Sequence, residues 1–215
     1  MLTARQGYAD DAGVVHKWSA TSAQRIVYLL PSPHAAATIV KPIYQCGQAI
    51  YVDGQHSGIV HVHSSMLGRE IATPTEITRL DGGVEIALTD KLIDGDDIYV
   101  VQEAVCGGFS PPSPVAHVSS ISSVKLAPPD VLGGLTPTGA YRTLRVSNVI
   151  PGATVTLTRN GTPIPFAARA FGMSEGDLAI PPDFALHLGD IIRATQTLCE
   201  LTSAPSGTRV EVFAT

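Results

Sequence analysis

Two histidines at alternate positions, His61 and His63, are the side chains whose type and spacing best suit metal binding. Residues i and i+2 of a β-strand point the same way, so both imidazoles could face one ion, with His56 as a third ligand. A metal site needs three or four convergent ligands, whereas paired strand histidines are ordinarily solvated or hydrogen-bonded to neighbours. We therefore expect no bound metal and no other cofactor.

The side of the strand that these histidines occupy depends on which of two arguments is followed. Local alternation with Val60 and Val62 places the valines in the core and both histidines in solvent. An internal repeat, described below and followed without a gap, aligns His61 with Val155, which is a core position. A shift of one residue reverses the second argument, so we expect His61 and His63 to face solvent.

Acidic and hydroxyl side chains give no clearer sign of chemistry. The aspartates Asp90, Asp94, Asp96 and Asp97 lack the ordered ligand spacing of a calcium loop, and the Gly-Asp pair at 95–96 is typical of a turn. Residues 108–111 lack the second glycine of a nucleophile elbow, and no phosphate-binding glycine loop, Cys-x-x-Cys or His-Glu-x-x-His occurs. We expect no catalytic residue and no enzyme activity.

Two glutamines, Gln102 and Gln196, occupy equivalent places in the similar expected strands 97–104 and 190–198. Each falls on the apolar face of its strand, where a buried amide must be hydrogen-bonded. We expect backbone groups of a crossing loop as the partners. The alternative is a ligand-binding amide in a cleft.

Composition limits what these residues could belong to. Of 215 residues, 44% are hydrophobic and 15% charged, so the chain can build a packed core and disorder is not expected. The net charge of −5 gives no basic footprint for nucleic acid, and no apolar run has the length of a membrane span. With 20 glycines and 16 prolines, short strands joined by many turns are favoured.

An internal repeat organises the chain. From Val52 to Gln102 the pattern recurs 94 residues later, from Val146 to Gln196, and the offset falls to 93 at Cys106 and Cys199. Such a match predicts two copies of one domain. In the second copy, alternation in 152–158 and an Asn-Gly turn at 160–161 predict β-hairpins, and no segment has helical periodicity.

These patterns predict an all-β fold with two tandem β-sandwiches and an extra N-terminal β arm. The expected boundaries are 1–33 for the arm or the remnant of a preceding repeat, 34–122 for the first sandwich and 123–215 for the second. A Ser-rich run followed by Pro128 and Pro129 supplies the linker between the sandwiches.

The copies resemble bacterial immunoglobulin-like domains of the Big type, which occur as tandem repeats in adhesins and surface proteins. The residues that carry the resemblance are 146–157, 186–196 and the closing Ser-x-x-Ser of 203–206, and it covers about 35–215. The first copy departs from it at His56-Ser57-Gly58. The only tryptophan is Trp18, so the tryptophan packed on a disulfide in antibody domains is missing from both copies.

The resemblance implies a non-catalytic structural or adhesive module, outside the cell or at its surface. The more specific prediction is that the chain is a subunit of an extracellular filament or surface assembly built by strand addition. The alternatives are a carbohydrate- or metal-binding β-sandwich and a hydrolase with a site between domains. Expected partners are proteins, through self-association or neighbouring repeats, with carbohydrate as a further candidate. Residues 1–7 lack a secretory apolar segment, so the chain uses another route or is a trimmed piece.

Three cysteines are too few to scaffold the fold. In a sandwich, a residue beside the first strands and the end of a late strand can come within bridging distance. This predicts a Cys46–Cys106 disulfide and a free, buried Cys199. The alternative is three reduced, buried thiols, as in a cytosolic protein.

The N-terminal arm is too short to bury a core of its own. Its strand Arg25, Ile26, Val27, Tyr28, Leu29 and Leu30 is apolar and is expected to pair with a sheet edge. The edge can belong to the first sandwich or to a neighbouring molecule, and we favour strand donation to the neighbour.

Overall fold

A computed structural model describes residues 7–9, 15–18, 35–104, 107–121, 125–137 and 142–213. The chain divides into two compact units, Met1–Pro33 and His34–Thr215. In the first unit, β1 (Gly7–Ala9) pairs antiparallel with β2 (Val15–Trp18). The expected donor strand Arg25–Leu30 lies outside the described residues.

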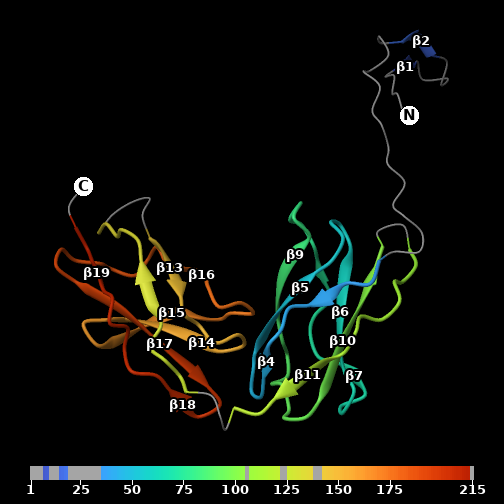
Figure 1. Cartoon of the computed structure of the whole chain (residues 1–215). Coiled ribbons are helices and arrows are strands. Elements are labelled where there is room, and N and C mark those ends of the chain that lie inside the picture. Colours follow the sequence, from blue (N-terminus) through green and yellow to red (C-terminus); the bar gives the residue numbers. More distant parts are fainter. Residues whose placement is uncertain are drawn as a thin grey trace. The chain divides into compact units, whose positions relative to one another are not determined.

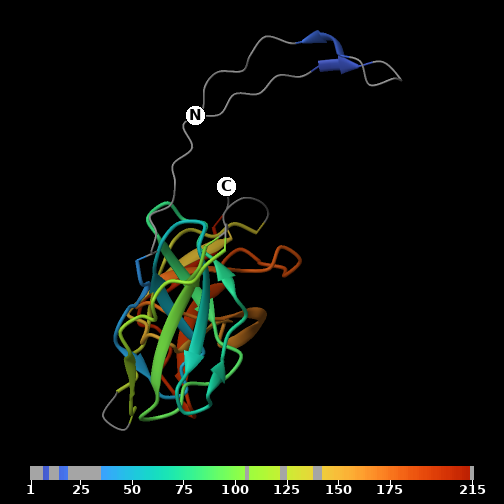
Figure 2. The same cartoon turned by 90° about the vertical axis from the view of Figure 1, so that its right-hand side faces the viewer.

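The first sandwich of the larger unit is built from two sheets (Figure 1). One sheet has the strand order β3 (Thr38–Ile39), β5 (Ala49–Asp53) and β9 (Gly83–Ala87). The other has the order β4 (Ile43–Tyr44), β11 (Ala116–Ser119), β10 (Asp97–Glu103), β6 (Ile59–Ser64) and β7 (Arg69–Glu70), with β8 (Thr75–Glu76) also paired to β6. Strands β6 and β10 lie side by side at its centre in both views (Figure 2).

The second sandwich repeats this arrangement. Its smaller sheet has the order β12 (Asp130–Leu132), β13 (Thr143–Ser147) and β16 (Gly176–Ala179). Its larger sheet has the order β15 (Thr162–Ala170), β14 (Thr154–Arg159), β17 (Ile191–Leu198) and β18 (Leu201–Thr202), with β19 (Val210–Glu211) also paired to β17. The described residues contain no α-helix, so the all-β prediction is confirmed.

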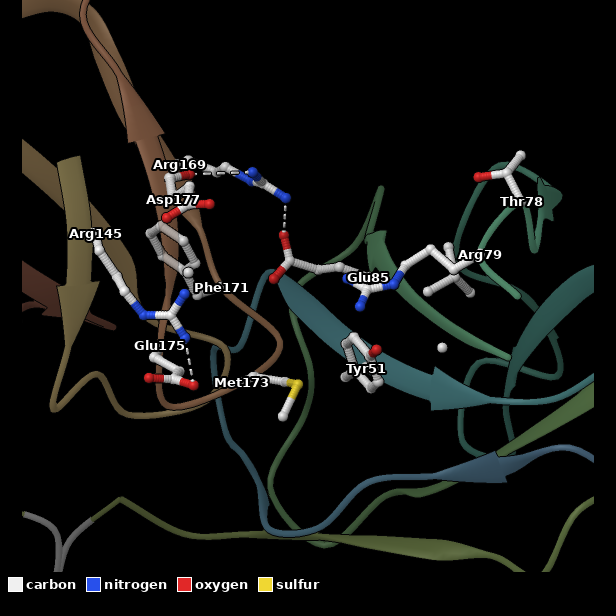
Figure 3. Close-up of a pocket in the computed structure, with 13 residues that line it drawn as sticks. Tyr51, Thr78, Arg79, Glu85, Arg145, Arg169, Phe171, Met173, Glu175 and Asp177 are labelled. Atoms are coloured by element: carbon white, nitrogen blue, oxygen red, sulfur yellow. Dashed lines mark hydrogen bonds and ion pairs between the residues drawn. The ribbon is translucent and has the colours of Figure 1, made fainter. Parts of the chain in front are cut away.

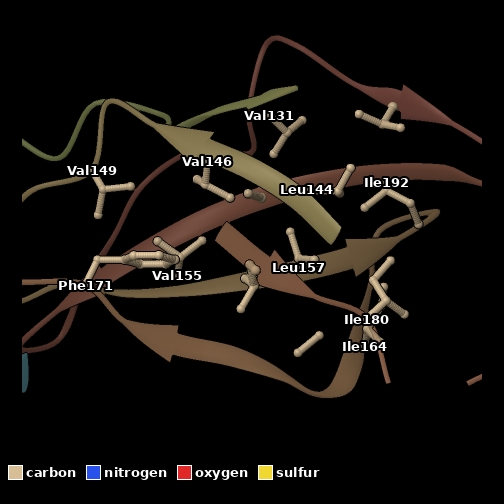
Figure 4. Packing of buried hydrophobic residues seen from close by; sticks show 14 of the residues in the cluster. Val131, Leu144, Val146, Val149, Val155, Leu157, Ile164, Phe171, Ile180 and Ile192 are labelled. Atoms are coloured by element: carbon tan, nitrogen blue, oxygen red, sulfur yellow. The ribbon is translucent and has the colours of Figure 1, made fainter. Parts of the chain in front are cut away.

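Each sandwich buries side chains from both of its sheets in a core of its own. One hydrophobic cluster lies within residues 37–118 and the other within 121–212. In the second, Leu144 of β13 faces Leu157 of β14 and Ile192 of β17, and Phe171 fills one end (Figure 4). Alternation produces these cores, because every second residue of a strand points to the same face.

The Ser-x-x-Ser segments complete the larger sheets where regular pairing ends. Ser110 N donates to the carbonyl of Gln102 at 2.8 Å, and Ser110 Oγ accepts the Gln102 N–H at 3.0 Å. Three further serines make the same pair of bonds: Ser113 with Val100, Ser203 with Gln196 and Ser206 with Ala194. A hydroxyl oxygen thereby takes the place of a strand carbonyl in these proline-rich segments.

Both glutamines are buried and bond to the backbone of a loop, the kind of partner expected from the sequence. Gln102 exchanges two bonds with the backbone of Gln55, at 3.0 and 2.9 Å. Gln196 Oε1 accepts the N–H of Ile150 at 2.8 Å, and its Nε2 donates to Asn148 O. Each amide therefore attaches a loop to the sheet beneath, the loop before β6 in the first sandwich and the loop before β14 in the second.

Val60 and Val62 are fully buried, so His61 and His63 point to the outer face of the sheet. Local alternation therefore gives the correct side, although both histidines are half-buried by neighbouring side chains. The ungapped alignment of His61 with Val155 is wrong, because Val155 corresponds to Val60.

The register of the sheets shows this correspondence. Val60 lies opposite Gln102, and Val155 lies opposite Gln196. The first copy is therefore one residue shorter than the second in the loop before β6. In that loop Ser57, which has a positive φ, takes the place of Gly152.

The predicted Cys46–Cys106 disulfide is wrong, because Cys46 pairs with Cys199. Cys199 is therefore not a free thiol, and Cys106 lies outside the described residues. Cys46 follows β4, which pairs with β11 beside the first residues of β10. A cysteine sulfur takes part in one disulfide at a time, so the bond to Cys199 excludes a bond from Cys46 to Cys106.

Candidate binding cleft at the joint between the sandwiches

The two sandwiches are joined by a covalent bond and by backbone contacts. Cys46 lies in the turn after β4 and Cys199 in the turn after β17, with 5.1 Å between their Cα atoms. Beside the disulfide, Gln48 N donates to the carbonyl of Gly152 at 3.0 Å. The partly buried side chain of Tyr44, from the first sandwich, packs against the core of the second.

Glycine permits this close approach at two positions. Gly152 has a φ of +88°, and a Cβ there would lie 2.7 Å from the Cα of Gly47. A Cβ on Gly172 would lie 2.3 Å from the carbonyl carbon of Ile50. Neither position can take a larger residue unless the sandwiches separate, because a Cβ atom does not approach other heavy atoms that closely.

Glu85, on β9, forms a polar bridge across the joint. Its Oε2 accepts the N–H of Gly172 at 2.9 Å, and its Oε1 accepts a bond from the Arg169 guanidinium. Arg169, on β15, also lies over the ring of Phe171, 5.4 Å from its centroid. The Glu85 side chain is only 17% exposed, so this ion pair is more shielded from water than an ordinary surface pair.

A cleft of about 570 Å³ opens beside this bridge. Tyr51, Arg79 and Glu85 line it from the first sandwich (Figure 3). From the second sandwich it is lined by Arg145, Arg169, Phe171, Met173, Glu175 and Asp177. Its volume is within the range of small-molecule sites in proteins.

Each arginine of the cleft holds a carboxylate. Arg145 contacts Glu175 at 2.7 Å, and Arg79 contacts Asp81 at 2.5 Å. The hydrogen bond from Arg79 lowers the pKa of Asp81, whose side chain is exposed. Burial raises the pKa of Tyr51, an effect that Arg79 partly opposes.

The candidate metal ligands are not gathered into a site. His61 Nδ1 lies 3.1 Å from Glu70, and its Nε2 lies 3.3 Å from Glu103. His63 instead stacks on Tyr99, with 5.1 Å between ring centroids, and His56 is exposed in a loop. The described residues contain no group of three or more histidines, cysteines or carboxylates suited to a metal ion.

The aspartates of the Gly-Asp turns order the backbone. Asp96 accepts the Ser64 hydroxyl at 2.5 Å and the Met66 N–H at 2.9 Å. Asp190 accepts the N–H of His187 and the amide of Asn160, both at 2.8 Å. Burial acts to raise the pKa of Asp190, but these hydrogen bonds outweigh it and the pKa lies below its usual value.

The residues of the cleft carry no pattern by which the sequence could reveal them. Glu85 and Arg169 are 84 residues apart and belong to no recognisable motif. At the joint beside the cleft, the one signal is Gly152 in the Pro-Gly turn, because a glycine there can mark a close backbone approach.

Within the described residues, no helix has the length and apolar character needed to cross a membrane. No protein-family model matches the chain. No curated protein matches it.

Solved structures similar to this chain include the following three. A biofilm-associated protein BSP domain is 15% identical with a TM-score of 0.34, and the match covers 84% of this chain and 29% of that one. The N-terminal part of the bacterial S-layer protein SbsC is 11% identical with a TM-score of 0.35, covering 82% and 44%. The chicken CNTN1 FN1–FN3 domains are 11% identical with a TM-score of 0.29, covering 84% and 65%. At these values the matches carry no argument about family or function.

Proposed function

We propose that this chain is a non-catalytic structural or adhesive module that works outside the cell. Its two immunoglobulin-like sandwiches act as one stiff unit. The observation that carries the proposal is the Cys46–Cys199 disulfide, which joins one sandwich to the other. Disulfides persist in oxidising compartments, which supports an extracellular or cell-surface location.

Stiffness distinguishes this joint from an ordinary pair of tandem domains. Domains on one chain move relative to each other by default, unless their interface is large or locked. Here a covalent bond, the backbone contact of Gly47 with Gly152 and the Glu85 bridge restrain the joint at separate points. A restrained joint suits a spacer that holds a binding surface at a set distance and orientation.

The proposal treats residues 34–122 and 123–215 as two copies of one domain. The matching strand orders, the paired buried glutamines and the paired Ser-x-x-Ser segments support this division. Neighbouring copies are then the natural protein partners.

Strand addition is the finer form of this proposal. Among the described strands, β9 and β16 each pair on one side only, so each leaves a sheet edge open. The donor would be the apolar segment 25–30 of a second molecule. Deleting residues 1–30 and measuring particle size by light scattering tests this. An unchanged particle size would exclude strand donation, and the proposal of a stiff two-sandwich module would be unaffected.

The stiff joint is tested by measuring distances between the sandwiches. Leu80 and Phe166 are 89% and 94% exposed, so a spin-labelled non-canonical residue at each should leave both cores intact. We expect one narrow distance distribution in the native protein and a broader one in Cys46→Ser/Cys199→Ser. Equal widths would overturn the role of the disulfide. Labelled Cys106→Ser serves as the control and should match the native protein.

A further inference from the structure

We propose that the cleft beside the joint binds a neutral oligosaccharide. A sugar site goes beyond the spacer role. It rests on that role in one respect: both sandwiches line the cleft, so the site exists only while the joint holds them together. Its volume of about 570 Å³ exceeds what a single ion or water cluster needs.

The charges of the cleft argue against an anionic ligand. Arg79, Arg145 and Arg169 are each already paired with a carboxylate. An incoming anion must displace one of these carboxylates and leave its charge unpaired, which offsets what the new contact gains. An uncharged ligand can bond to the outer atoms of the pairs and leave them intact.

The paired groups suit hydroxyls. Guanidinium and carboxylate groups are planar and present donors and acceptors at adjacent positions, which match neighbouring hydroxyls on a sugar ring. The pairs fix these groups before the ligand arrives, so less side-chain entropy is lost on binding. Arg145 and Glu175 are about half exposed, at 54% and 47%, so their outer atoms are available to a ligand.

The apolar surface of the cleft suits the C–H face of a sugar. Tyr51 and Met173 reach into it from opposite sandwiches (Figure 3). The Tyr51 ring can pack on a pyranose while its phenol bonds to a hydroxyl. A tyrosine ring beside planar charged groups offers an apolar face for a sugar ring and hydrogen-bonding partners for its hydroxyls.

The test is calorimetric titration of the full chain with maltohexaose, cellohexaose, chitohexaose and mannohexaose, and with oligogalacturonate as the acidic probe. We expect one or more of the neutral sugars to bind, and Arg145→Gln/Glu175→Gln to weaken that binding at least about tenfold. This exposed pair lies within the second sandwich, so its loss leaves the joint and the fold in place. The matched control is Arg69→Gln/Asp90→Asn, an exposed pair outside the cleft, which should bind as the native protein does.

Failure to bind any neutral sugar, binding of the acidic probe alone, or equal weakening by both double variants would overturn the proposal. The spin-label distances report the joint separately, so a failed cleft and a failed spacer are distinguishable. Release of reducing ends from a bound sugar would support the cleft as a sugar site and overturn the non-catalytic role.

Discussion

The carboxylate of Glu85, in the first sandwich, accepts the backbone N–H of Gly172, in the second, at 2.9 Å. A side chain of one sandwich thereby orders the backbone of the other, at a glycine where a Cβ would meet Ile50. The polar bridge and the close packing depend on each other, because neither forms unless the sandwiches are in contact.

Glu85→Gln should lower the free energy of unfolding by about 1 kcal/mol, because a neutral amide oxygen is a weaker acceptor for Gly172 and Arg169. Solvent reduces the effect, since the Arg169 side chain is 51% exposed. Chemical denaturation measures it. Asp90→Asn, which removes an exposed ion pair with Arg69, is the control and should stay within about 0.5 kcal/mol. Equal losses would show that Glu85 does not stabilise the joint.

Gly152→Ala should destabilise the protein more than Gly161→Ala. The two glycines have nearly equal φ angles, +88° and +87°, so the backbone penalty of about 1 kcal/mol is shared. A Cβ at 152 would also meet Gly47, whereas nothing lies within 4 Å at 161. We expect the first loss to exceed the second by about 1–3 kcal/mol in thermal or chemical unfolding. Matching losses would mean that the Gly47 contact does not restrain the joint.

Replacing the two strand histidines should have separable effects. His61 is 18% exposed and lies between Glu70 and Glu103. His61→Thr should lower the free energy of unfolding by about 1 kcal/mol, because the two carboxylates lose their shared partner and repel each other. His63→Thr loses mainly the stacking on Tyr99 and should cost about 0.5 kcal/mol. Denaturation of each single variant decides it. A larger loss at His63 would contradict the contacts, and loss of a bound metal would contradict the expected absence of a site.

Asp190 should contribute stability that depends on pH. Its folded pKa is lowered below the ordinary value of 3.8, so the folded protein favours the charged form. The contribution is present above the unfolded pKa and is lost as the pH falls through the folded pKa. The stability gap between native protein and Asp190→Asn should therefore shrink below about pH 3.8. A gap that stays constant between pH 5 and 2 would exclude this linkage.

Local pattern was sufficient for the strands and for much of the core. Alternation in 59–64 and 154–159 places the valines inward, because side chains of a strand have a period of two residues. The internal repeat located both buried glutamines, since an amide on an apolar face needs a backbone partner. The same repeat misplaced His61 against Val155, because a one-residue gap in a loop exchanges the two faces of a strand.

The sequence by itself determined an all-β chain whose apolar residues form two sandwich cores, because strand periodicity and turn residues act over a few neighbouring positions. Tertiary structure alone decided that Cys46 bonds to Cys199 and that Glu85 meets Gly172. These partners are separated by 153 and 87 residues, and no local pattern relates them. Their meeting depends on which ends of the two sandwiches come into contact, which is known only once both sandwiches are folded and packed together.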